Sequence, residues 1–162
     1  RKAAQPRNTG RLTAMNEKIT FEQMLPLIEQ QLKSGGEVRF KPNGTSMLPL
    51  VRQGIDEVVI GAYGGGLKKY DIPFYRRKNG TFVMHRLVKK TADGQYLMRG
   101  DHQDEFETGI TDSDIIGVVK CVIRGGKPIY SGTLEFRLWG ILGPLYIRTK
   151  RRLYEIKGRL SK

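Results

Sequence analysis

The chain is poor in cysteine and histidine: its 162 residues include one cysteine and two histidines. An intrachain disulfide is therefore impossible, and a zinc site would have too few of its usual ligands. The sequence also has no run of the roughly 18 apolar residues that a membrane-spanning helix needs, and no apolar signal-peptide core lies near its start. We therefore expect one domain that folds around its own core without a metal or another cofactor.

Positive charge is concentrated at the two ends of the chain. The formal net charge is +13, of which residues 1–18 carry +4 and residues 146–162 carry +6, so that only +3 remains for the 127 residues between them. Basic ends can meet the phosphates of a nucleic acid or of an anionic lipid surface. The nearly neutral body and the lack of a helix-turn-helix or RNP-like pattern argue against specific nucleic-acid binding. We interpret residues 1–18 as a basic, disordered extension.

An amphipathic helix is predicted after this extension. Thr20 and Gln23 have the spacing of a capping box, and Gly35 with Gly36 is typical of a helix end. Pro26 conflicts with a regular helix, so the helix either kinks there or begins near Met24. Apolar residues recur at helical spacing between these limits: Phe21, Met24, Leu25, Ile28 and Leu32.

From Glu37 onward the pattern predicts mostly β-structure. Asn79 with Gly80 and Asp93 with Gly94 are hairpin turn signals, so residues 72–99 are predicted to form a three-stranded antiparallel meander. We predict a mainly β domain of the α+β class over residues 19–130. The runs rich in branched and aromatic residues are EVRF, EVVIGA, IPFYRR, TFVMHRLV, QYLMR and IIGVVKCVIR.

Residues 131–162 differ in character and are predicted to form a helical basic tail with a break at Gly143 and Pro144. Residues 138–147 are an apolar run that contains a tryptophan and a tyrosine and is followed directly by RTKRR. This composition suits a segment at a membrane surface, so peripheral membrane contact through residues 138–152 is one interpretation. The other is a helix packed on the sheet with basic side chains extending to solvent.

One hydroxyl has an unusual setting, Ser46 in the turn KPNGTSMLPLVRQG. A serine is a poor nucleophile unless a base takes its proton. His102 lies in a polar turn, whereas His85 lies in TFVMHRLV on the same strand face as Val83 and Leu87. Taken alone, His85 is better interpreted as a core histidine bonded to a backbone carbonyl.

A carboxylate near His85 would favour the catalytic interpretation, because it fixes the imidazole tautomer and stabilises the imidazolium. The predicted hairpin brings Asp101 back toward His85, and Asp104, Glu105 and Glu107 are further candidates. A lysine base is disfavoured: Lys89 is too far along the strand, and Lys68 and Lys69 lie in a glycine-rich loop that we expect to be exposed. Cys121 is predicted to be a buried, inert thiol.

Three segments together resemble the signal peptidase superfamily, which includes the self-cleaving repressors of the SOS type. They are GTSMLPLVRQG, FVMHRLV and YLMRGDHQDE…SDIIGVV, in the order and approximate spacing of that superfamily, and they span residues 38–123. The resemblance implies a coiled antiparallel β-sheet peptidase fold, with Ser46 as nucleophile. It is closest to the archaeal and endoplasmic-reticulum variety, which implies His85 as base. A third residue follows the GD box, and Asp101, Asp104 and Glu107 are the alternatives.

The chain departs from the superfamily in two respects. No stretch of the sequence is expected to form the usual transmembrane anchor, and Gly44 stands where many members carry a serine that binds the oxyanion. The backbone around Ser46, with the Thr45 hydroxyl, would then supply the oxyanion site. We expect a serine endopeptidase that binds a peptide or protein substrate in extended conformation. The alternatives are a weak or inactive binding module on the same fold and, less favoured, a basic nucleic-acid-binding protein.

Overall fold

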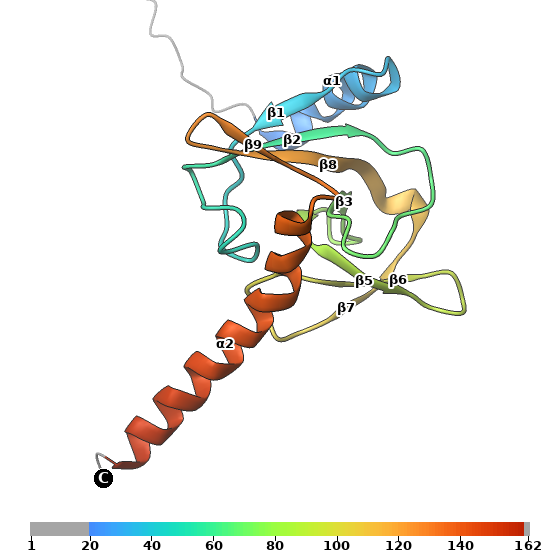
Figure 1. Ribbon diagram of the computed structural model, residues 1–162. Helices are drawn as coiled ribbons and strands as arrows, with labels where there is room; N and C mark the ends of the chain where they lie inside the picture. Colours follow the sequence, from blue (N-terminus) through green and yellow to red (C-terminus); the bar gives the residue numbers. More distant parts are fainter. Residues whose placement is uncertain (1–19, 161–162) are drawn as a thin grey trace, which may run out of the picture.

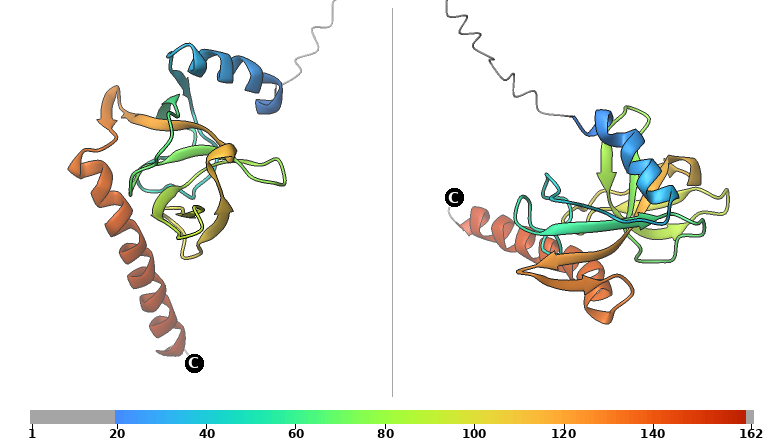
Figure 2. Two further views of the ribbon diagram at one scale, coloured as in Figure 1. Left: turned by 90° about the vertical axis from the view of Figure 1, so that its right-hand side faces the viewer. Right: turned by 90° about the horizontal axis from the view of Figure 1, so that it is seen from above.

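A computed structural model describes residues 20–160, including side chains as far as Ile147 and those of Thr149, Arg152 and Leu153. It consists of two antiparallel β-sheets and two helices (Figures 1 and 2). The predicted α+β class is therefore confirmed. The extension predicted at residues 1–18 lies outside the described residues.

Helix α1 (Phe21–Lys33) begins where the capping box predicts. Thr20 accepts a hydrogen bond from the backbone N–H of Gln23, and the Gln23 side chain accepts one from the N–H of Thr20. The alternative start near Met24 is wrong, because the reciprocal caps satisfy the first turn although Pro26 lies inside the helix. Ile28 and Leu32 are buried and fix α1 on the larger sheet.

The larger sheet has the strand order β1-β2-β8-β3-β4, and β9 also pairs with β8. The smaller sheet has the order β5-β6-β7. Every pairing is antiparallel. The strands are β1 (Val38–Phe40), β2 (Glu57–Ala62), β3 (Pro73–Arg76), β4 (Phe82–Met84), β5 (Arg86–Lys90), β6 (Tyr96–Arg99), β7 (Glu107–Ile110), β8 (Ile115–Arg124) and β9 (Lys127–Tyr130), with a short 3-10 helix η1 (Asp112–Asp114) before β8.

The predicted meander over residues 72–99 is wrong in one respect. Both hairpin turns form, but the β3–β4 hairpin belongs to the larger sheet and the β5–β6 hairpin to the smaller one. The run predicted as one strand, TFVMHRLV, is split between the sheets at His85, which belongs to neither strand. Met84 pairs with Phe74 and Arg86 pairs with Arg99, so the chain leaves one sheet and enters the next within a single residue.

Two hydrophobic clusters lie on either side of this crossing. The first packs α1, the larger sheet and the start of α2 together, with Leu50, Val58, Ile60 and Val122 fully buried. The second belongs mainly to the smaller sheet and comprises Tyr75, Leu87, Tyr96, Met98 and Ile110. His85 is therefore held at the junction between two independently packed regions.

Helix α2 (Leu134–Leu160) is continuous, so the predicted break at Gly143 and Pro144 is wrong. A proline inside a helix removes one backbone hydrogen bond, but Pro144, Gly140 and Gly143 are buried against the body of the protein, and this packing holds the helix together. The C-terminal half of α2 extends away from the sheets (Figures 1 and 2). Neither described helix is long and apolar enough to cross a bilayer.

Candidate active site

Buried apolar residues and the backbone conformation of one glycine hold the Ser46 turn in place. Met47 and Leu50 are buried behind the turn, while Ser46 is half-buried and Thr45 is exposed. Gly44 has a φ of +120°, which residues with a side chain rarely adopt. This backbone explains why a glycine stands at position 44.

The Ser46 turn packs against Gly100 and His102 at the end of β6. The Ser46 carbonyl accepts a hydrogen bond from the backbone N–H of His102 at 2.8 Å, and a Cβ atom on Gly100 would lie 2.6 Å from the Ser46 carbonyl oxygen. Arg86 pairs with Arg99 at the end of the β5–β6 ladder, and along the chain His85 directly precedes Arg86 while Gly100 directly follows Arg99. Gly100 therefore contacts the Ser46 turn directly, whereas the described hydrogen bonds of the His85 ring are to Tyr75 and Glu107 and not to Ser46.

The His85 ring is buried and belongs to a polar cluster with Tyr75 and Glu107. Its Nδ1 atom lies 3.2 Å from Glu107 Oε2 and 3.2 Å from the Tyr75 hydroxyl. The Tyr75 hydroxyl donates to Glu107 Oε2 at 2.9 Å. Arg77 donates to both oxygens of Glu107, at 2.6 and 2.7 Å. The acid that contacts the histidine is thus Glu107 on β7.

This cluster determines which ring nitrogen of His85 carries the proton. An ionised Glu107 only accepts hydrogen bonds, and the Tyr75 hydroxyl hydrogen is already directed to Glu107. Both neighbours of Nδ1 therefore require Nδ1 to be the donor. The neutral ring then has its lone pair on Nε2, the atom that a general base uses when a carboxylate orients the ring from the other side.

The charges in the cluster shift the pKa of each member. Burial is the largest cause that lowers the pKa of His85 below 6.5, although Glu107 acts in the opposite direction. Burial by itself raises the pKa of Glu107, but hydrogen bonds from Arg77 and Tyr75 outweigh it, so that the pKa of Glu107 is lowered. Near neutral pH the site therefore combines a neutral imidazole with an ionised carboxylate.

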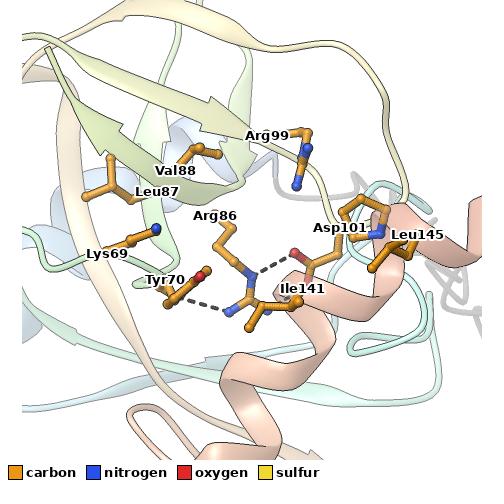
Figure 3. A pocket seen from close by; sticks show the side chains of 11 residues that line it. Lys69, Tyr70, Arg86, Leu87, Val88, Arg99, Asp101, Ile141 and Leu145 are labelled. Carbon is orange, nitrogen blue, oxygen red and sulfur yellow. Dashed lines mark hydrogen bonds and ion pairs between the residues drawn. The ribbon is translucent and has the colours of Figure 1, made fainter. Parts of the chain in front are cut away.

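Asp101, the first candidate for the orienting acid, makes its hydrogen bonds to a different residue. Its carboxylate binds Arg86, with Nε–Oδ1 and Nη2–Oδ2 distances of 2.7 and 2.5 Å, and both side chains are buried. Arg86 also donates to the backbone carbonyl of Tyr70 and stacks over Phe136. Figure 3 shows this ion pair beneath α2. Asp101 makes no hydrogen bond to His85 within the described residues.

The other candidates differ in how far they are buried. Asp104 is half-buried and Glu105 exposed in the segment between β6 and β7, and His102 is exposed. Lys68, Lys69 and Lys89 are exposed, as expected. Cys121 is a free, buried thiol, and burial raises its pKa. Tyr75 and Arg77 were not predicted, because no sequence signal connects them with a histidine on another strand.

An apolar groove adjoins the site between β1 and β4. Its volume is about 570 Å³. The chain continues from the lining residues Lys41, Pro42 and Asn43 into the Ser46 turn. It continues from the lining residue Met84 directly into His85. β4 pairs on one side only, with β3, and so forms an edge of the larger sheet. Four aromatic side chains line the groove: Phe21, Phe40, Phe74 and Phe82.

Within the described residues, His, Cys, Asp and Glu side chains form no group of three or more that could hold a metal ion. Comparison with protein-family models, with curated proteins and with solved structures finds no match to this chain. The functional interpretation therefore depends on the residues and geometry described above.

Proposed function

We propose that this chain is a serine endopeptidase of the signal peptidase type, with Ser46 as nucleophile, His85 as general base and Glu107 as the residue that orients His85. The observation that carries the proposal is the contact of Glu107 and Tyr75 with His85 Nδ1, which leaves the lone pair on Nε2. A core histidine bonded to a backbone carbonyl, the competing interpretation, would not need an acceptor-only partner at this nitrogen.

In the proposed reaction, the Ser46 hydroxyl oxygen attacks a peptide carbonyl while Nε2 of His85 takes its proton. The negative charge on the carbonyl oxygen is stabilised by the backbone around Ser46 and by the Thr45 hydroxyl. His85 then gives its proton to the leaving amine, the C–N bond breaks, and an acyl-enzyme remains. Water deprotonated by the same Nε2 releases the acid product. Glu107 stays ionised and stabilises the imidazolium in both steps.

The substrate in this proposal is an extended peptide. The free edge of β4 offers backbone hydrogen-bonding groups to an added strand, and alternate side chains of such a strand would enter the apolar groove. By analogy with signal peptidases, small residues would precede the cleaved bond.

A weak or inactive binding module is the second candidate. One observation favours it: Arg77 binds both oxygens of Glu107, which neutralises part of the charge that would otherwise stabilise a His85 imidazolium. In this case the groove would still bind an extended peptide, and substitution of Ser46 would leave that binding unchanged.

The test is hydrolysis of a peptide library, read by mass spectrometry, with the wild type, Ser46→Ala and His85→Ala. We expect cuts at defined bonds by the wild type and a loss of about a thousandfold or more in each variant. Ser113→Ala and His102→Ala are matched controls, because both side chains are exposed and His102→Ala keeps the backbone N–H that binds Ser46. No cleavage by the wild type, or equal cleavage by Ser46→Ala, would leave the binding module as the better interpretation.

A further inference from the structure

Helix α2 has two apolar faces, of which only one is covered. The covered face packs closely on the body through small residues: a Cβ atom on Gly140 would lie 2.5 Å from Arg86 Cδ, and one on Gly143 would lie 2.8 Å from the Asp101 carbonyl oxygen. Phe136 on this face is buried, with an exposed fraction of 1%. Glycines at the contact let the helix backbone approach the Arg86–Asp101 ion pair (Figure 3).

Large apolar side chains lie on the opposite side, which we call the outer face of α2. At 100° per residue, Leu134, Leu138 and Leu142 lie about 120–160° around the helix axis from Phe136. The exposed fractions on this face reach 73% at Leu134 and 61% at Leu153. The outer face consists of Leu134, Leu138, Leu142, Tyr146 and Leu153. Ile141 and Leu145 are partly exposed but line a pocket with Arg86 and Asp101, so they do not belong to this face (Figure 3).

The outer face is long and continuous. From Leu134 to Leu153 the helix rises roughly 28 Å at 1.5 Å per residue, and every large apolar residue of the face is at least 38% exposed. Single exposed leucines are common on protein surfaces, but a row of five large apolar residues along one helix marks an interaction surface.

The charge of the same segment indicates what kind of partner binds the outer face. Residues 146–162 contain seven lysines and arginines and a single glutamate, so the apolar row overlaps and is followed by a strongly cationic stretch. Apolar side chains that enter the acyl region, with cations at headgroup phosphates, are the features that hold a helix in the interface of an anionic bilayer.

We propose that α2 docks this protein on anionic lipid surfaces by its outer face. The helix lies in the interface and does not span the bilayer. A second copy of the chain fits the same face less well, because pairing two α2 helices would bring two cationic segments together. The covered face keeps its contact with Arg86 and Asp101, so the body stays attached when the outer face is inserted. This inference does not depend on the peptidase activity.

The test is vesicle flotation of the full chain with phosphatidylcholine alone and with phosphatidylcholine mixed with phosphatidylglycerol. The variant is Leu138→Glu with Leu142→Glu. The matched control is Leu27→Glu with Ile55→Glu, which makes the same charge change at two exposed apolar residues outside α2, with exposed fractions of 68% and 63%. Thermal melting by circular dichroism shows whether each variant is folded.

We expect the wild type and the control to float with the anionic vesicles, and the variant to bind them at least about tenfold more weakly. Binding should weaken with added salt and be much lower on phosphatidylcholine alone. Three results would overturn the proposal: no flotation of the wild type at low ionic strength, equal binding by all three proteins, or equal weakening in variant and control. A dimer seen by light scattering that only the α2 variant loses, without lipid binding, would assign the outer face to a second copy.

Discussion

Replacement of Glu107 by glutamine is the most informative perturbation of the candidate site, because an amide cannot serve all the donors that the carboxylate binds. Arg77 donates to both oxygens, and Oε2 also accepts from Tyr75 and contacts His85 Nδ1. If the amide oxygen takes the position of Oε2, its NH₂ group faces Arg77 Nε. If the NH₂ group takes the position of Oε2, it faces Tyr75, Arg77 and His85 Nδ1, and all three donate toward Oε2 in the wild type.

The second orientation favours the wrong tautomer, with the His85 proton on Nε2, and such a ring cannot accept the Ser46 proton. Loss of the acid in a Ser-His-Asp triad through this effect costs about 10⁴-fold in kcat. Here Tyr75 remains as an acceptor at 3.2 Å from Nδ1, so we expect a smaller loss of about a hundredfold to a thousandfold. This corresponds to about 3–4 kcal/mol of transition-state stabilisation.

The pH profile of kcat/KM separates this role from a merely structural one. The wild-type rate should rise with pH through a pKa below 6.5, because burial lowers the pKa of His85. Glu107 raises that pKa, so in Glu107→Gln the acid limb should move to still lower pH. Glu105→Gln, at an exposed carboxylate of the same segment, should change neither quantity. The assigned role would be refuted if folded Glu107→Gln kept full activity, or if its kcat/KM rose with pH at the same pH as in the wild type.

Three further predictions concern the supports of the site. Gly100→Ala should lower kcat/KM about tenfold or more, because its Cβ would force the Ser46 carbonyl from 2.6 Å to at least 3.0 Å; activity equal to wild type in a peptide assay would contradict this. Asp101→Asn should lower the free energy of unfolding by about 3 kcal/mol in denaturant titration, since it leaves the Arg86 charge buried without its partner. Asp56 is buried, and arginine hydrogen bonds hold its pKa at about 2, so Asp56→Asn should cost about 2 kcal/mol at pH 7. That cost should vanish as pH falls from 3.8 to about 2, because the stabilising charge is lost over that window, and a cost independent of pH would contradict the linkage.

Local patterns in the sequence were sufficient to predict where one helix begins and where two hairpins turn. The capping box set the start of α1, and the glycines at positions 80 and 94, both with positive φ, set the two hairpin turns. These features depend on neighbouring residues only, so they can be predicted without knowledge of the fold. The continuity of α2 through Pro144 could not be predicted in this way, because it depends on what the helix packs against.

The sequence by itself determined the mainly β class, the choice of Ser46 and His85 as the residues to examine, and the cationic ends, since each follows from residue type and short-range spacing. Only the tertiary structure decided which acid contacts His85. Strand β7 was not predicted, and its pairing with β6 brings Glu107 to the imidazole, while Arg86 binds Asp101. Contacts of this kind join residues far apart in the chain, and they are set by strand register and by the pairing of buried charges, which no local pattern encodes.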